Sequence, residues 1–291
     1  MPKRRLIVTH YAPDLDAIGA TWILKRFDPQ TYGQADVAFV NPGEKISLKQ
    51  TEENGYQLHE VTHVDTGLGK FDHHQPERAN QFVCAASLAH QHVCQVHPEI
   101  KKDQALQKIV NFINEIDHFQ EINWPTAENI RYSLMLHELI RGYELTHKQN
   151  NECQMKFGLR CLDFAYAAVK ETMEARDIID EKGQNFEISH GPCLALETSN
   201  DETMKVAQKQ GYILVVRKDP NLGHARIKIR PDTQFDLKPL HNKIIDLDKK
   251  GTWFYHQGGK MLLNGSAKKK DAIPTSLSLE KIIELIKETY A

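Results

Sequence analysis

The chain has 291 residues, a formal net charge of −2 and 26% charged residues. This length allows two domains of ordinary size, and the charge excludes a global field that would draw the protein onto nucleic acid or anionic lipid. The five cysteines include no Cys-x-x-Cys pair, which disfavours a zinc ribbon or a disulfide framework and fits a reducing compartment. The first apolar run ends at Val8, too early for a signal peptide, and no later run approaches a membrane span. We therefore expect a cytoplasmic protein with no membrane association.

The first part of the chain alternates predicted strands and helices. Short apolar runs predict strands over Leu6–Thr9, Ala35–Val40, Val61–Val64 and Lys70–His74. Apolar residues at helical spacing predict helices over Asp16–Phe27, Cys84–Val96, Asp103–Phe119, Asn129–Leu145 and Phe157–Lys182. This order predicts an α/β fold with a doubly wound, mostly parallel sheet.

The pattern changes after Gly183, which resembles a helix C-cap, and we place the domain boundary there, between residues 1–183 and 184–291. The second part predicts strands over Cys193–Glu197, Tyr212–Arg217 and Ala225–Arg230, and a hairpin over Trp253–Leu263. Helices are predicted over Asp201–Gln210, Leu237–Leu247 and Leu279–Tyr290. These elements indicate a smaller α+β domain.

Ionisable side chains gather at the predicted strand ends. They are His10, Asp14, Asp16, Asp65, Asp72, His73 and His74. Carboxylates and imidazoles this close compete unless a cation lies between them, and a ligand set without thiolate suits Mn²⁺ or Mg²⁺ better than a structural zinc. The number of ligands is enough for two ions roughly 3.5–4 Å apart, which predicts a two-metal site for displacement at phosphorus.

Part of this set has an ordinary structural explanation. Asp14 precedes an apolar helix, and alone it is better explained as a helix cap. The addition of Asp65 and of Asp72-His73-His74 reverses that preference in favour of a metal site.

The pattern His10-x-x-Pro13-Asp14-x-Asp16, the strand-end Asp65 and the run Asp72-His73-His74 together resemble the DHH phosphoesterase superfamily. The superfamily includes RecJ-like exonucleases, oligoribonucleases, cyclic-dinucleotide phosphodiesterases and family II inorganic pyrophosphatases. A later metal-binding Asp in these proteins is matched by Asp117, which otherwise would be explained as a carboxylate at the edge of an apolar stripe. The compact spacing resembles the branch of the melanocyte-proliferation-gene exonucleases most.

The resemblance implies a role for each ligand. His10, Asp14 and Asp65 would hold one ion, and Asp16, Asp65, His73 and Asp117 would hold the other, with Asp65 bridging. His74 would contact the scissile phosphate, and Asp72 would orient a ligand imidazole. The cofactors would be two Mn²⁺ ions, with Mg²⁺ as the alternative.

Cationic side chains of the second domain are the predicted substrate contacts, across a cleft between the domains. They are His224, Arg226, Lys228, His256, Lys260 and Lys268. Arg226 and Lys228 also alternate as the solvent face of a strand would, and Lys268 lies in a charge run that is typical of a solvated loop. Trp253, Phe254 and Tyr255 could stack on bases, although core packing explains them equally well.

We therefore expect an Mn²⁺-dependent phosphohydrolase, of the exonuclease or oligoribonuclease type, acting on short RNA or single-stranded oligonucleotides. The small net charge suits a short substrate better than a long duplex. Two alternatives stay open: hydrolysis of pyrophosphate or of another small nucleotide, and a nucleotide-binding regulator without turnover. The oligomeric state, a homodimer included, is also open.

Overall fold

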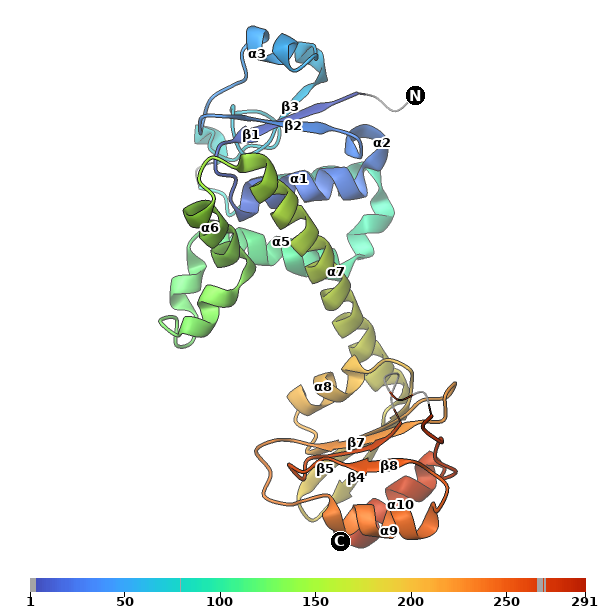
Figure 1. The fold of residues 1–291 in the computed structure, drawn as a ribbon. Coiled ribbons are helices and arrows are strands. Elements are labelled where there is room, and N and C mark those ends of the chain that lie inside the picture. Colours follow the sequence, from blue (N-terminus) through green and yellow to red (C-terminus); the bar gives the residue numbers. More distant parts are fainter. Residues whose placement is uncertain (1–3, 79, 266–268, 270) are drawn as a thin grey trace. The chain divides into compact units, whose positions relative to one another are not determined.

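The computed structural model describes residues 4–78, 80–265, 269 and 271–291. The chain divides into two compact units, Met1–Val169 and Lys170–Ala291 (Figure 1). Helix α7 (Asn151–Lys182) contributes residues to both units. The fold is of the predicted α/β class, with a parallel sheet in the first unit and a mixed sheet in the second. The domain boundary after residue 183 stays a prediction.

The described residues of the first unit form three strands, which helices follow or separate. Its strands are β1 (Leu6–His10), β2 (Asp36–Val40) and β3 (Val61–His63). Its helices are α1 (Leu15–Phe27), α2 (Pro29–Tyr32), α3 (Leu48–Glu53), α4 (Ala85–Val96), α5 (Gln104–Asp117), α6 (Leu136–Thr146) and the first part of α7.

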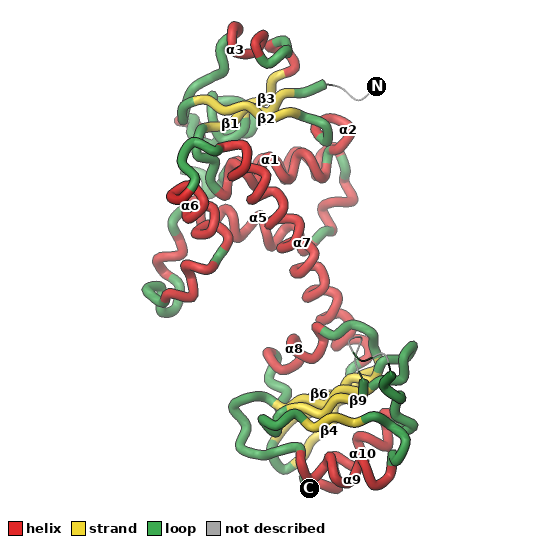
Figure 2. Tube along the Cα trace, viewed as in Figure 1, coloured by secondary structure: helices red, strands yellow, loops and turns green. Residues whose placement is uncertain are grey.

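The three strands form a parallel sheet in the order β2-β1-β3 (Figure 2). Alternate residues of β1 enter different cores: Ile7 packs with α1, α4 and α5, whereas Leu6 and Val8 pack with Ile46 and Tyr56. Both faces of the sheet are therefore covered, as parallel sheets require.

The parallel pairing brings the ends of β1 and β3 to one edge of the sheet. Val8 pairs with His63, so the next residues of both strands emerge side by side. His10 is the last residue of β1, and Asp65 follows β3 by two residues. The predicted ligands of these two segments therefore meet at the carboxyl edge, where open α/β sheets bind ligands.

Two predicted elements of the first unit differ from the structure. The strand over Lys70–His74 is reduced to one isolated bridge, between Val64 and Phe71. The helix over Asn129–Leu145 is broken into a 3₁₀ turn, Ile130–Leu134, and α6, because Met135 has an extended backbone. Apolar spacing predicted one helix there, but Ile130 and Leu134 are exposed and no core holds them in register.

The second unit carries a six-stranded sheet in the order β4-β5-β6-β7-β9-β8. Its strands are β4 (Gln184–Ile188), β5 (Gly191–Glu197), β6 (Leu214–Lys218), β7 (Ala225–Ile229), β8 (Trp253–Tyr255) and β9 (Met261–Asn264), and its helices are α8 (Glu202–Lys209), α9 (Lys238–Leu247) and α10 (Leu279–Thr289). Helices α9 and α10 cover one face, while α8 and the end of α7 pack on the other. Strand β4 was not predicted; it pairs antiparallel with β5 and buries only Phe186 and Ile188.

Within the described part of the chain, no helix combines the length and the apolar content needed to cross a membrane.

Candidate metal centre

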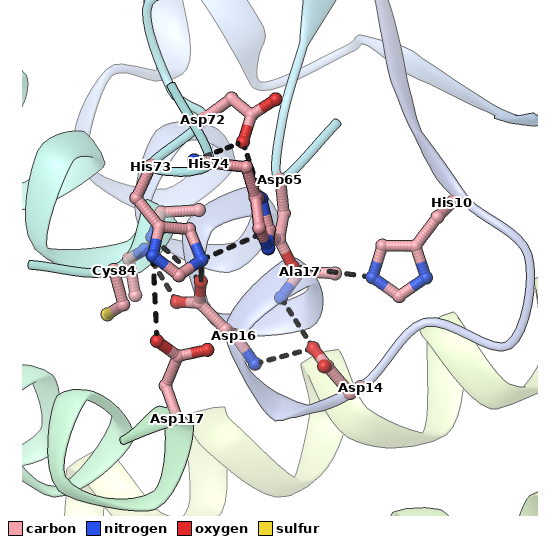
Figure 3. A network of polar contacts seen from close by, with 12 residues as sticks. His10, Asp14, Asp16, Ala17, Asp65, Asp72, His73, His74, Cys84 and Asp117 are labelled. Atoms are coloured by element: carbon pink, nitrogen blue, oxygen red, sulfur yellow. Dashed lines mark hydrogen bonds and ion pairs between the residues drawn. The ribbon is translucent and has the colours of Figure 1, made fainter. Parts of the chain in front are cut away.

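Asp65 lies among the other predicted ligands (Figure 3). Its backbone has a φ of 54°, a left-handed conformation that residues with a β-carbon adopt at a cost. The residue is only 5% exposed. Its carboxylate oxygens have different neighbours: Oδ2 lies 3.3 Å from Nε2 of His10, and Oδ1 lies 3.4 Å from Nε2 of His73. The carboxylate thus stands between two groups of ligands.

The first group consists of His10, Asp14 and Asp65, and one potential ligand atom of each lies within 4.8 Å of the other two. Nδ1 of His10 donates to the carbonyl of Tyr11 at 2.8 Å, which leaves Nε2 as the ring nitrogen for a cation. Oδ1 of Asp14 accepts from two amides in the first turn of α1, at 3.0 Å each. Asp14 therefore does cap the helix, but the cap occupies one oxygen and leaves the other for a cation.

The second group consists of Asp16, His73 and Asp117, again with one atom each within 4.8 Å. Asp16 is 3% exposed, and its two oxygens accept from the amides of Ala85 at 2.7 Å and Ala86 at 2.8 Å. These amides open α4, where the helix dipole favours a carboxylate. Nδ1 of His73 lies 3.7 Å from Oδ2 of Asp117, which ends α5.

Asp72 and His74 form a pair beside these groups. Oδ1 of Asp72 accepts from Nδ1 of His74 at 2.7 Å and from the His74 amide at 3.0 Å. Asp72 is fully buried, whereas the side chain of His74 is 60% exposed. The imidazole that Asp72 orients is thus His74, the predicted phosphate contact, and not the predicted ligand His73.

The cluster carries excess negative charge and contains polar atoms without partners. Burial and the charges of Asp65 and Asp117 raise the pKa of Asp16 well above its ordinary value, and burial raises the pKa of Asp117 to about 6. Among the described residues, Oδ1 of Asp65 and Nε2 of His73 are buried without a hydrogen-bond partner. Divalent cations would satisfy these atoms and neutralise the carboxylates, so the residues fit Mn²⁺ or Mg²⁺.

Metal binding should release protons. Burial lowers the pKa of His10, but the hydrogen bond to Asp65 and the charge of Asp14 outweigh it and raise the value to about 9. The nearby carboxylate of Asp65 raises the pKa of His73 to about 9 as well. With pKa values of about 9, both imidazoles carry a proton at pH 7 and must be neutral to bind a cation, so we expect Mn²⁺ to displace at least two protons.

The dissociation constant for Mn²⁺ should consequently fall as the pH rises from 7, by about tenfold per pH unit for each proton displaced. Above pH 9 it should no longer change. Calorimetric titration in buffers of different ionisation enthalpy measures the proton count. Tight binding without proton release would place the cations away from His10 and His73.

The predicted substrate contacts of the second unit fall into two groups. Lys228 pairs with Met261, which places its backbone beside Lys260 and His256 at one end of β7. Arg226 lies further along the strand, and His224 lies at the other end, about 17 Å away for five residues of strand. Lys268 lies outside the described residues.

The cationic groups of Arg226 and Lys260 already have partners. Nη1 of Arg226 lies 2.5 Å from Oδ2 of Asp201. The ammonium of Lys260 donates to the carbonyl of Thr233 at 2.7 Å and to that of Phe235 at 2.9 Å. Burial lowers the pKa of Lys228.

The sequence analysis assigned no role to α6, yet this helix borders the metal centre. A cavity of about 330 Å³ is lined by Asp14, Asp16 and Asp117 together with Arg141. Nη1 of Arg141 lies 3.2 Å from Oε2 of Glu138 at the surface. Only the fold brings Arg141 to this cavity, since its helix shows an ordinary amphipathic pattern.

No protein-family model and no curated protein matches the chain. A solved DHH-domain structure, described as a member of a family of ribosomal proteins, is 14% identical with a TM-score of 0.34 and covers 99% of this chain and 88% of that chain. Exonuclease RecJ bound to manganese is 13% identical with a TM-score of 0.31, over 98% and 89%. RecJ from Thermus thermophilus with Mg²⁺ is 11% identical with a TM-score of 0.34, over 98% and 49%. These TM-scores are too low to support a statement about chemistry, so the chemistry of the site rests on its own geometry.

Proposed function

We propose that the chain is a metal-dependent phosphohydrolase of the DHH superfamily, in the melanocyte-proliferation-gene-like branch. Its substrates are short RNA or other single-stranded oligonucleotides, and it hydrolyses their phosphodiester bonds. The motifs of the sequence support the superfamily, and the geometry of the first unit supports the use of divalent cations.

One observation carries this proposal. The buried carboxylate of Asp65 stands between two ligand groups, and each of its oxygens lies within 3.4 Å of an imidazole nitrogen. A carboxylate shared in this way can bridge two cations, which is the arrangement used for in-line displacement at phosphorus.

The ligand groups divide between two sites. His10, Asp14 and Asp65 would hold one Mn²⁺ ion, and Asp16, His73 and Asp117 would hold the other together with Asp65, which lies 3.4 Å from His73. When bound, the cations supply Lewis-acid polarisation of the phosphoryl group and lower the pKa of an attacking water.

Other side chains act on the phosphate directly. Asp72 fixes the ring of His74 through Nδ1, and Nε2 of that ring contacts the scissile phosphate. Arg141, in the cavity beside the ligands, binds a phosphate oxygen through its guanidinium, which suits that geometry. His224, Arg226, Lys228, His256, Lys260 and Lys268 remain the proposed contacts of the second unit.

An activity screen with Mn²⁺ tests the proposal. The substrates are a 5′-labelled dinucleotide, a longer single strand, a cyclic dinucleotide and pyrophosphate. We expect a mononucleotide from the dinucleotide, and we expect a chelator to abolish its formation. Phosphate release from pyrophosphate alone would replace the proposal by a pyrophosphatase, and no turnover of any substrate would leave a binding protein.

A further inference from the structure

Tyr11 presents an aromatic ring directly beside the metal centre. It follows the ligand His10, and its amide donates to the carbonyl of Val40 at 2.8 Å, which anchors its backbone to β2. The residue is 46% exposed although it is a large apolar ring. One face of the ring stacks on Phe39, with centroids 6.5 Å apart and an interplanar angle of 24°. The structure thus supports the ring from one side and leaves it accessible.

A cavity of about 620 Å³ opens at this ring. Leu145 adds an apolar wall, and Lys148 and Gln149 add polar groups that can donate hydrogen bonds. A volume of this size, with an aromatic wall and a few polar groups, is typical of small-molecule sites.

The loop at the base of the cavity is held by α7. The amide of Ala12 donates to Oδ1 of Asn151 at 2.7 Å, and Nε2 of Gln154 donates to the carbonyl of Pro13 at 3.0 Å. Ala12 has a φ of 51°, so these bonds hold a backbone conformation that alanine rarely adopts. These hydrogen bonds therefore fix the position of Tyr11 relative to the ligands.

The cavity adjoins the one at the ligands. Ala12, Glu144 and Gln154 line both, and the second cavity also contains Asp14 and Asp16. A molecule with a charged group at the ligands can thus extend a flat apolar group toward Tyr11.

We infer that the Tyr11 cavity binds a nucleobase of the substrate, stacked on the tyrosine ring, while the adjacent phosphate lies at the metal centre. This inference rests on the proposed function and adds the site of base recognition. Stacking on an aromatic side chain tolerates every base, because each base has a π face. The enzyme should therefore require a base near the scissile bond without selecting which one.

The test compares two dinucleotide substrates in the full chain with Mn²⁺, one with both bases and one with an abasic residue. The measured quantity is the ratio of kcat/KM for the intact over the abasic substrate. We expect Tyr11→Leu to lower this ratio by about 10- to 100-fold, through KM rather than kcat. Tyr11→Phe keeps the ring and should restore the ratio.

Two controls separate this role from others. Because Tyr11 follows His10, calorimetric titration with Mn²⁺ must show the same affinity in Tyr11→Leu as in the wild type. Phe254→Leu tests the rival stacking position on β8, where the ring is also exposed. A fall in the ratio with Phe254→Leu and not with Tyr11→Leu would move the base to the second unit and overturn the inference.

Failure of the inference differs from failure of the proposed function. If the wild type cleaves both substrates and Tyr11→Leu leaves their ratio unchanged, base recognition at Tyr11 is wrong while hydrolysis stands. If the wild type cleaves neither substrate, the proposed function fails and the inference fails with it.

Discussion

Replacing Asp65 with Asn should lower the rate of hydrolysis by on the order of 10³-fold or more, because this carboxylate stands between both ligand groups. Asn keeps the size of the side chain and tolerates the left-handed backbone at this position better than most residues, so the fold should survive. Mn²⁺ titration should show weaker binding at both sites. Activity and circular dichroism together measure the two effects.

A matched control removes one carboxylate elsewhere in the chain. Asp180 is an exposed residue near the end of α7, and Asp180→Asn makes the same chemical change away from the ligands. It should leave turnover and Mn²⁺ binding unchanged. An Asp65→Asn variant that hydrolyses the dinucleotide at the rate of this control would refute the bridging role.

His73→Ala and His74→Ala should have different effects although the residues are neighbours. His73 lies 3.4 Å from Asp65 and 3.7 Å from Asp117, so its loss should reduce the bound Mn²⁺ from two ions to one and lower kcat by on the order of 10³-fold. His74 is anchored by Asp72, so its loss should lower kcat by about 10²- to 10³-fold while two ions still bind.

Electron paramagnetic resonance distinguishes these outcomes, since two Mn²⁺ ions that share a ligand give a coupled signal and a single ion does not. Kinetics on the dinucleotide supply kcat for each variant. Loss of the coupled signal in His74→Ala, with the signal intact in His73→Ala, would exchange the roles of the two imidazoles.

The meeting of His10 and Asp65 could be predicted from the sequence because each lies at or just after the end of a strand. A parallel sheet brings such ends to one edge, and β1 and β3 are direct neighbours, so His10 and Asp65 converge. The cap formed by Asp14 could also be predicted, since an Asp before an apolar helix has a local role that depends on few other residues.

Features that depend on distant segments could not be predicted in this way. The amides of Ala85 and Ala86 hold Asp16 across about 70 positions of the chain, and no side-chain pattern marks a backbone donor. Arg141 lines the ligand cavity from α6, which begins only after the break at Met135, and apolar spacing did not indicate that break. The sequence could not indicate which imidazole Asp72 holds, because adjacent histidines are equivalent in sequence and differ only in orientation.

The carboxylate of Asp16 also closes the first turn of α4. Burial raises the pKa of Asp16, and without cations the nearby carboxylates of Asp65, Asp117 and Asp14 raise it further. Protonation of Asp16 would then weaken its hydrogen bonds to the amides of Ala85 and Ala86. A chelator should therefore destabilise the first turn of α4 as well as stop the proposed hydrolysis. Hydrogen exchange at the amides of Ala85 and Ala86 should therefore become faster as the number of bound cations decreases.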